Sequence, residues 1–285
     1  MGKADRNRAQ SARARVAAQQ QQARQREARR RMIAIGAVTV AVLAVVGIII
    51  GAVLNKHGTS QSGGTKGALP AQVQAKLTVP PSTLATVGVG SSAPQLIRPA
   101  TGAKLTSGGK PEMLYIGAEW CPYCAAERWA MAVALSRFGT FSPLKGIHSS
   151  STDVYPNTAT LTFYQAKYTS KYLVFTPVEN QDVNRNTLQT PTAQQQALWS
   201  KYEANSYPFI NFGNMFWASV TYSPQVLQGL TWSQIAADLH NPSSPVAKGA
   251  DGSANLFTAA ICRMTGNQPA NVCTTAPVST LEGQI

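Results

Sequence analysis

The sequence predicts an α/β fold, with a mixed sheet flanked by helices, that follows a single N-terminal transmembrane helix. Three observations indicate this arrangement. An uncharged stretch of bilayer length lies near the N-terminus, and strand-like and helix-like segments alternate along the rest of the chain. One apolar strand runs directly into Cys121-Pro122-Tyr123-Cys124 and then into a helical pattern. A chain of 285 residues accommodates one domain of about 200 residues with appendages.

The N-terminal region predicts how the chain is oriented in a membrane. Residues 1–31 contain ten Lys or Arg residues and two acidic residues, so this basic tail carries +8 of the net charge of +13. Residues 32–54 are uncharged and long enough to span a bilayer, and no small-residue cleavage site follows them. We therefore expect a signal anchor that stays in the cell membrane, with the tail cytoplasmic and the C-terminal domain extracytoplasmic.

The basic tail has a second interpretation, since such segments also bind anionic lipid or nucleic acid. The rest of the chain contains no basic stripe with interleaved aromatic residues. We therefore expect no nucleic-acid partner, and we interpret the tail as a determinant of membrane topology.

A polar linker at 55–70 leads into the predicted domain at 71–245, and residues 246–285 form a C-terminal helix and tail. Ten residues separate Cys262 from Cys273 in this tail. Because disulfides persist outside the cytosol, we expect a structural disulfide between these two cysteines. A second redox pair that exchanges electrons with the first is the alternative.

The elements of the domain follow from composition and periodicity. Residues 71–87 contain two adjacent prolines and predict an extended lead-in. Short runs rich in apolar, β-branched and aromatic residues predict strands at 95–98, 112–117, 145–150, 158–164 and 171–178. A period near 3.6 or an N-terminal capping signal predicts helices at 124–138, 192–204, 231–240 and 254–264. A Gly-Asn turn predicts a hairpin between a strand after Pro208 and a strand at 215–221.

The two cysteines at 121 and 124 meet the minimum requirement for thiol–disulfide exchange, which is two closely spaced thiols. A helix N-terminus carries unpaired N–H groups and partial positive charge, which stabilise a thiolate. We expect Cys121, first in the motif and exposed, to be the attacking thiol and Cys124, more buried, to resolve the mixed disulfide. Pro122 suits the first helical position, and Tyr123 adds an aromatic surface beside the sulfurs.

Two other interpretations apply to the same spacing. A Cys-x-x-Cys pair holds zinc when further ligands lie nearby, but His57, His148 and His240 are scattered and no four-ligand pattern forms, so we expect no metal. The pair is also compatible with a purely structural bridge. The junction between a strand and a helix favours redox chemistry over that bridge.

The order of elements around the dithiol resembles the thioredoxin fold over about 95–240. The Cys-Pro-Tyr-Cys quartet is similar to the glutaredoxin motif, and Ala118-Glu119-Trp120-Cys121 resembles the run that precedes the thioredoxin motif. The signal anchor, the Tyr-rich middle and the two-cysteine tail resemble a family of membrane-anchored thioredoxin-like proteins called domain of unknown function 929.

The resemblance to thioredoxins implies positions for substrate contacts. It implies a cis peptide bond before Pro208, opposite the dithiol, which leaves the backbone of Tyr207 free to pair with an extended substrate. It also implies that Trp120 borders the site. We therefore take Trp120, Pro122, Tyr123, Tyr207 and Pro208 as candidate substrate contacts.

One position departs from the thioredoxin pattern. Thioredoxins have a buried acid six residues before the first cysteine, and Tyr115 stands there in this chain. Glu119 and Glu127 flank the motif and are candidates for proton transfer. The alternative for both, near-surface solvated carboxylates, fits their residue type better.

These observations predict a membrane-anchored extracytoplasmic oxidoreductase that exchanges disulfides with protein thiols. It would need no cofactor and would exchange electrons with a membrane redox partner. The alternative is a non-catalytic binding or assembly module with a structural bridge in its motif. A glutathione-dependent enzyme is a third hypothesis, and it rests only on the Cys-Pro-Tyr-Cys motif.

Overall fold

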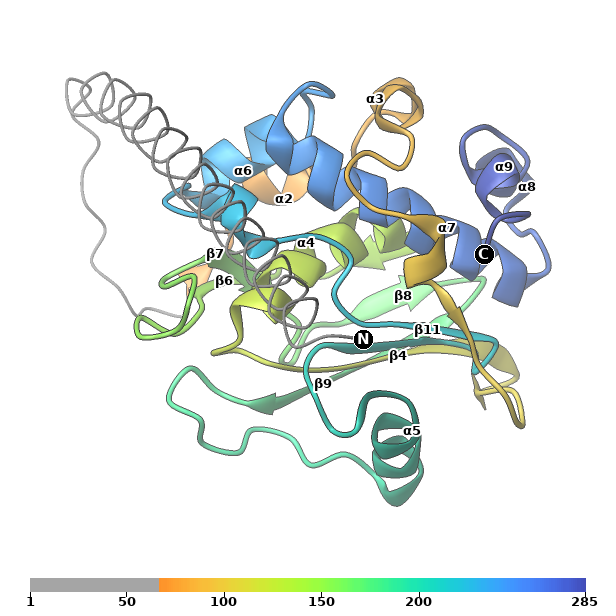
Figure 1. The fold of residues 1–285 in the computed structure, drawn as a ribbon, viewed down its shortest axis with the longest axis horizontal. Helices are drawn as coiled ribbons and strands as arrows, with labels where there is room; N and C mark the ends of the chain where they lie inside the picture. Colours follow the sequence, from red (N-terminus) through yellow and green to blue (C-terminus); the bar gives the residue numbers. More distant parts are fainter. Residues whose placement is uncertain (1–66) are drawn as a thin grey trace, which may run out of the picture. The chain divides into compact units, whose positions relative to one another are not determined.

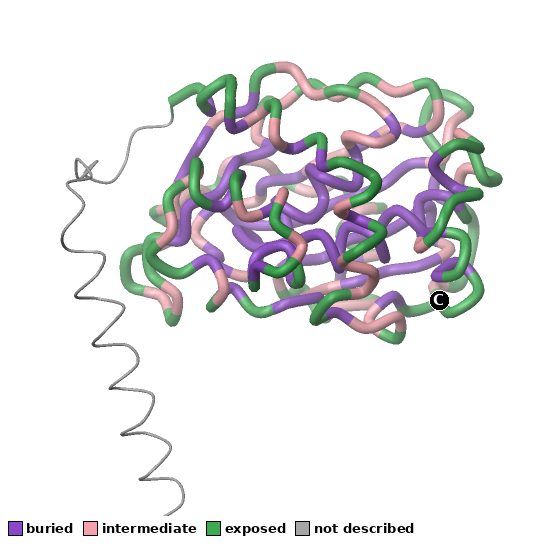
Figure 2. The backbone as a smooth tube through the Cα atoms, turned by 90° about the horizontal axis from the view of Figure 1, so that it is seen from above, coloured by how far each residue is buried: buried purple, intermediate pink, exposed green. Residues whose placement is uncertain are grey.

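The computed structural model describes residues 67–285, and the basic tail, the expected anchor at 32–54 and most of the linker lie outside this range. No helix among residues 67–285 combines the length and the apolar character that crossing a bilayer requires. The described residues belong to one compact unit. Figure 2 shows buried backbone through its interior and exposed segments around it.

A mixed sheet forms the centre of this unit (Figure 1). Strand β4 (Lys110–Ala118) pairs in parallel with β9 (Val174–Gln181) on one side and antiparallel with β10 (Phe209–Phe212) on the other. Beyond β10, the sheet continues through β11 (Phe216–Ala218) to β2 (Arg98–Pro99), and β3 (Thr106–Ser107) pairs with the start of β4.

The continuous apolar run of β4 is explained by layers on both faces of the sheet. Its alternate side chains Met113 and Tyr115 face the cluster that contains α4 (Pro122–Ser136) and α7 (Gly252–Thr265). Leu114 and Ile116 pack instead with side chains from α5 (Ala193–Glu203). Figure 1 shows α4 and α7 on one side of the sheet and α5 on the other.

Smaller elements surround these layers. One small sheet contains β1 (Gly67–Ala68), β6 (Lys145–His148) and β7 (Ala159–Thr162). A second pairs β5 (Gly139–Phe141) with β8 (Tyr168–Ser170). The other helices and helical turns are α2 (Ala71–Ala75), α3 (Pro81–Val87), η1 (Pro94–Leu96), η2 (Pro224–Leu227), α6 (Trp232–Asp238), η3 (Ala247–Asp251), α8 (Ala270–Cys273) and α9 (Val278–Leu281).

The predicted elements that frame the dithiol are confirmed, with ends shifted by one to three residues. The expected strand at 112–117 lies within β4, and the helices at 124–138, 192–204, 231–240 and 254–264 correspond to α4, α5, α6 and α7. The predicted hairpin is β10 and β11, with positive φ at Gly213 and Asn214 in its turn.

The predictions of an extended lead-in at 71–87 and of a strand at 95–98 are wrong. Residues 71–87 contain α2 and α3, joined by a short turn, and each helix begins directly after a proline at its N-cap, because proline suits the start of a helix as well as an extended segment. Pro94 likewise begins η1, which occupies the first half of the expected strand, and strand geometry begins only at Arg98.

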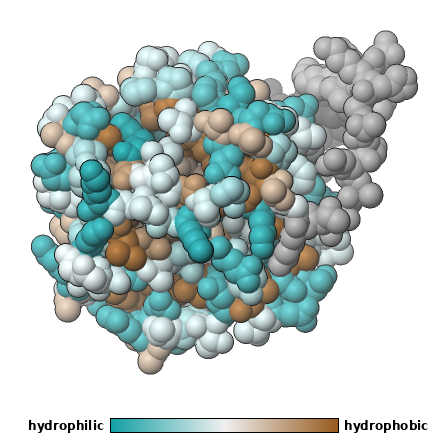
Figure 3. All heavy atoms as spheres, turned by 180° about the vertical axis from the view of Figure 1, so that it is seen from behind, coloured by the Kyte–Doolittle hydropathy of each residue, from teal (hydrophilic) through white to brown (hydrophobic). Residues whose placement is uncertain are grey.

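The surface of the described unit is mixed. Figure 3 shows hydrophilic and apolar side chains interspersed on one face. Among residues 67–285, Val154 is the exposed large hydrophobic side chain. Scattered apolar groups of this kind are ordinary on soluble surfaces.

Candidate functional site

The candidate dithiol lies where β4 ends and α4 begins. Cys121 is the N-cap of α4, and Pro122 occupies the first helical position, where its missing N–H is tolerated. The Cys121 Sγ accepts a hydrogen bond of 3.2 Å from the Cys124 backbone N–H. The sulfur of Cys121 therefore takes the place that a serine or aspartate oxygen takes in an ordinary cap.

Both cysteines are free thiols, and both are buried. Cys121 keeps 4 % of its surface exposed, so the expectation of an exposed attacking thiol is wrong. The partly buried side chains of Trp120, Tyr123 and Tyr207 form an aromatic cover that packs against the cluster of Ala118, Cys121 and Cys124. Because so little of Cys121 is exposed, movement of this cover would increase access to its sulfur.

The surroundings separate the two thiols electrostatically. Hydrogen bonding with Cys124 lowers the pKa of Cys121, and the Arg128 charge lowers it further, against the effect of burial. Burial raises the pKa of Cys124 well above its usual value. This division gives a first cysteine that ionises readily and a second that keeps its proton.

The cation near the dithiol is Arg128, which the sequence analysis did not single out. Its guanidinium binds the Glu179 carboxylate of β9 through two hydrogen bonds, of 2.8 Å and 2.7 Å, and donates a third of 2.8 Å to the Ala118 carbonyl. Arg128 and Glu179 are both fully buried. In the sequence, Arg128 lies one turn after Cys124 in the predicted helix. This spacing could have placed Arg128 near the dithiol, because such pairs share a helix face.

Tyr115 occupies the position at which thioredoxins have a buried acid. Its ring is fully buried, and its hydroxyl has no hydrogen-bond partner among residues 67–285. Burial raises the pKa of Tyr115 well above its usual value, so this position holds a neutral phenol. A Cβ at Gly117 would lie 1.9 Å from the Tyr115 hydroxyl, so this ring requires glycine two residues later.

Glu119 and Glu127 are both fully buried, so the expectation of solvated carboxylates is wrong. The Thr162 hydroxyl donates to Glu119 Oε1 at 2.9 Å. Glu127 accepts from the backbone N–H and the hydroxyl of Thr221, each at 2.7 Å. Burial raises the pKa of Glu127 to about 8, although the bonds from Thr221 oppose that shift. Neither carboxylate reaches solvent because neighbouring elements cover both.

The peptide bond between Tyr207 and Pro208 is cis, as expected. Pro208 directly precedes β10, which pairs with β4, and Tyr207 packs against the two cysteines. The Tyr207 hydroxyl donates to Asn180 Oδ1, and its ring lies 5.0 Å from the Trp199 ring. Burial raises the pKa of Tyr207 to about 12.

Two loops border the dithiol. The Arg185 guanidinium lies 3.7 Å from the centre of the Trp120 ring, and Trp120 Nε1 donates to Gln181 at 2.9 Å. On the other side, the Tyr155 ring lies edge-on to Tyr123 at 6.0 Å. The structure thus brings all five candidate substrate contacts to the start of α4 or to the cis-proline segment beside it.

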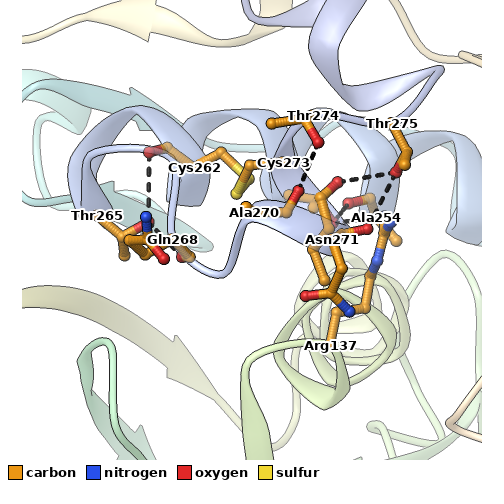
Figure 4. Close-up of a disulfide and its surroundings, with 12 residues drawn as sticks. Arg137, Ala254, Cys262, Thr265, Gln268, Ala270, Asn271, Cys273, Thr274 and Thr275 are labelled. Carbon is orange, nitrogen blue, oxygen red and sulfur yellow. Dashed lines mark hydrogen bonds between the residues drawn. A yellow bond between two sulfur atoms is a disulfide. The ribbon is translucent and has the colours of Figure 1, made fainter.

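The remaining two cysteines form a disulfide away from this site. Cys262 and Cys273 are joined, and Figure 4 shows the bridge between α7 and α8. At the start of α7, the Ser253 hydroxyl lies 2.7 Å from the hydroxyl of Thr221, which also contacts Glu127. Cys262 lies nine residues further along α7, roughly 13 Å along the helix axis. The structure does not bring the two cysteine pairs together, which disfavours a direct relay between them.

Residues 67–285 contain no group of three or more His, Cys, Asp or Glu side chains arranged to hold a metal ion. The family described as "Domain of unknown function (DUF929)" matches residues 99–263. No curated protein and no solved structure matches the chain.

Proposed function

Because the DUF929 match covers more than half of the chain, the protein belongs to this family, and we propose that it is a membrane-anchored extracytoplasmic thiol–disulfide oxidoreductase acting on protein thiols. One observation carries the proposal. Cys121 is a free thiol at a helix N-cap, its pKa is lowered, and a partner thiol one turn away keeps its proton. Structural cysteines have no need of this asymmetry.

The arrangement of elements supports a thioredoxin-like assignment within this proposal. The chain passes from β4 through the dithiol into α4, then to the parallel strand β9, to α5 and to an antiparallel hairpin. The hairpin begins directly after the cis bond at Pro208. Thioredoxin-like folds have the same order and the same placement of a cis-proline.

The location and the partners complete the proposal. An anchor at 32–54 with a basic cytoplasmic tail would hold the domain at the outer membrane face, where disulfides persist. Extracytoplasmic protein thiols or disulfides are the proposed substrates. A membrane redox partner would reset the dithiol after each turnover, and no cofactor is required.

The proposed reaction balances within the two sulfurs and the substrate. The Cys121 thiolate attacks a substrate disulfide, one sulfur leaves as a thiolate, and a mixed disulfide forms on Cys121. Cys124 loses its proton and attacks Cys121, which releases the second substrate thiolate and leaves a Cys121–Cys124 disulfide. The protein is oxidised by two electrons and the substrate is reduced by two, and the reverse sequence oxidises a substrate dithiol.

Exchange assays in both directions test the proposal on the full-length protein in detergent. Insulin reduction and oxidation of a model dithiol should both depend on Cys121, and Cys121→Ser should abolish both. A Cys262→Ala/Cys273→Ala variant is the matched control and should retain exchange. Absence of turnover in both directions, with Cys121→Ser equal to the wild type, would refute the proposal.

A non-catalytic binding module is the second candidate function, and the burial of Cys121 favours it. In that case the dithiol would form a structural bridge that stays oxidised in a reducing glutathione buffer and resists alkylating probes. Measuring the reduction potential of the pair distinguishes the two. A potential below about −300 mV indicates a structural bridge, because such bridges resist the glutathione pool.

A further inference from the structure

Four buried oxygen-bearing side chains form a continuous row beside the dithiol. Glu127 Oε2 lies 2.7 Å from the Thr221 hydroxyl, which lies 2.7 Å from the Ser253 hydroxyl. The Ser253 hydroxyl lies 2.6 Å from the Ser92 hydroxyl. The row joins four separate segments, namely α4, the loop after β11, the start of α7 and the turn after α3.

The row satisfies its hydrogen bonds whether Glu127 is charged or neutral. When Glu127 is a carboxylate, Thr221 donates to it, Ser253 donates to Ser92, and Ser92 donates to the Thr221 carbonyl, 3.1 Å away. When Glu127 is protonated, it donates to Thr221, and Thr221 donates instead to Ser253. The two patterns differ by one proton and by the direction of the Thr221 hydroxyl, and neither leaves a hydroxyl of the row without an acceptor.

The two ends of the row have different surroundings. Glu127 is fully buried and lies three residues after Cys124 on α4, so these two side chains are neighbours on the helix surface. Ser92 keeps 7 % of its surface exposed and follows the exposed Ser91. The row therefore runs from the neighbourhood of the resolving thiol toward solvent.

We propose that Glu127 accepts the proton of the Cys124 thiol and passes it through Thr221 and Ser253 to Ser92 and solvent. The inference rests on the proposed exchange reaction and adds the step that frees Cys124 to attack. The S–H bond of Cys124 breaks as an O–H bond forms on Glu127, and the new thiolate attacks Cys121 and expels the substrate thiolate. Glu127 then returns to the carboxylate. Its proton passes to Thr221, each hydroxyl of the row passes its own proton to the next, and Ser92 releases one proton to solvent.

Other titratable groups near Glu127 share its environment. Cys121 lies on the same helix, and its negative charge raises the pKa of Glu127. Tyr222, after β11, interacts with both Glu127 and Asp251, but burial raises its pKa well above its usual value and it stays neutral. Burial raises the pKa of Asp251, at the start of α7, to about 8.

Ellman's reagent separates the two steps in the full-length reduced protein. A first release of thionitrobenzoate reports attack by Cys121, and a second reports resolution by Cys124. Glu127→Gln should leave the first phase unchanged and slow the second about 100-fold. Thr221→Val, which keeps the backbone bond to Glu127, should slow the second phase about tenfold, and Thr221→Ser should restore it.

The pH profile distinguishes a proton path from a structural role. In the wild type, the rate of the second phase should rise with pH up to about 8, following the Glu127 carboxyl. In Glu127→Gln, the rise should move upward to the higher pKa of Cys124. Thr258→Val is the matched control, because the Thr258 hydroxyl is buried on α7 and donates to Ala254 at 2.7 Å, outside the row.

The outcomes separate this inference from the proposed function. Two phases in the wild type, with an unchanged second phase and pH profile in Glu127→Gln and Thr221→Val, would overturn the proton path and leave the exchange reaction intact. A wild-type protein that gives neither phase would overturn both. Equal slowing by Thr258→Val and Thr221→Val would assign the effect to packing and would also overturn the path.

Discussion

The two cysteine pairs lie at opposite kinds of helix end. Cys121 is the N-cap of α4, where backbone N–H groups face its sulfur. Cys262 lies in the last turn of α7, where its own carbonyl accepts hydrogen bonds from Gly266, Asn267 and Thr265. A helix N-terminus stabilises a thiolate and a C-terminus disfavours one. The two helix ends therefore favour a thiolate at Cys121 and disfavour one at Cys262, which fits the exchange proposed for the first pair and the disulfide seen in the second.

The two pairs also differ in the groups around them. Buried ionisable residues gather near the start of α4, with Arg128 and Glu179 on the β9 side and Glu127 on the α7 side. Around the bridge, threonine hydroxyls donate to nearby backbone carbonyls, and Arg137 is the ionisable side chain labelled there in Figure 4. A buried ion pair and a buried carboxylate therefore distinguish the surroundings of Cys121 and Cys124 from those of the bridge.

The largest effect should follow from removing the buried cation. Arg128→Met leaves the Glu179 carboxylate buried and uncompensated, which should cost about 3–5 kcal/mol of unfolding free energy. The pKa of Cys121 should rise as well, because the Arg128 charge lowers it. Urea unfolding and the pH dependence of alkylation measure the two effects.

A double variant separates stability from reactivity in this experiment. Arg128→Met/Glu179→Gln removes both charges and should recover most of the stability, while the pKa of Cys121 remains raised. A single variant as stable as the wild type, or an unchanged Cys121 pKa, would contradict this account of the dithiol site.

Removing the disulfide should cost less unfolding free energy than Arg128→Met and should leave the exchange reaction unchanged. Cys262→Ala/Cys273→Ala releases a link with a sequence separation of 11 residues. A closed loop of that size stabilises a protein by about 3 kcal/mol through the unfolded state. Chemical unfolding measures the loss, and the exchange assays should give unchanged rates. Lost exchange in a folded double variant would instead support the second redox pair.

The sequence predicts the frame of the site well. The apolar run before Cys121 and the 3.6-residue pattern after it identify β4 and α4, both of which follow from local periodicity along the chain. The resemblance to the thioredoxin fold implies the cis bond at Pro208, which the structure contains.

The burial of the site could not be predicted in the same way. Glu127 and Arg128 are adjacent charged residues that resemble a solvated helix face, yet the loop after β11 and strand β9 supply their partners. Glu179 lies 51 residues from Arg128, and Ser253 lies 32 residues from Thr221. Charged and hydroxyl residues at such separations show no pattern in the sequence until the fold joins them.

Titration should affect the dithiol end of the molecule more than the bridge. The pKa of Glu127 is raised to about 8 in the folded protein from its usual 4.5, so the folded state holds a proton that the unfolded state loses. Stability should therefore be fully present below about pH 4.5 and should fall by up to about 1.4 kcal/mol per pH unit between pH 4.5 and 8.

Variants identify the residues whose titration produces this pH dependence of the unfolding free energy. Glu127→Gln should flatten the curve of unfolding free energy against pH, and Asp251→Asn should remove a similar part, because burial raises the Asp251 pKa to about 8 from 3.8. Repeating the titration on Cys262→Ala/Cys273→Ala provides the comparison, and its slope should match that of the wild type. A slope that persists in Glu127→Gln/Asp251→Asn would place the titrating groups elsewhere.

The smallest effect concerns access to Cys121. Arg185 is 57 % exposed and lies over Trp120, which packs against the two cysteines. An exposed cation–π contact contributes about 0.5–1 kcal/mol, so Arg185→Ala should let Trp120 move away two- to fivefold more often, with faster alkylation of Cys121 by iodoacetamide. Arg263→Ala is the matched control, because Arg263 lies over Phe216 at 5.6 Å and is next to Cys262. Equal alkylation rates in the wild type and Arg185→Ala would show that Trp120 does not limit access, and the aromatic cover would then have to open at Tyr123 or Tyr207.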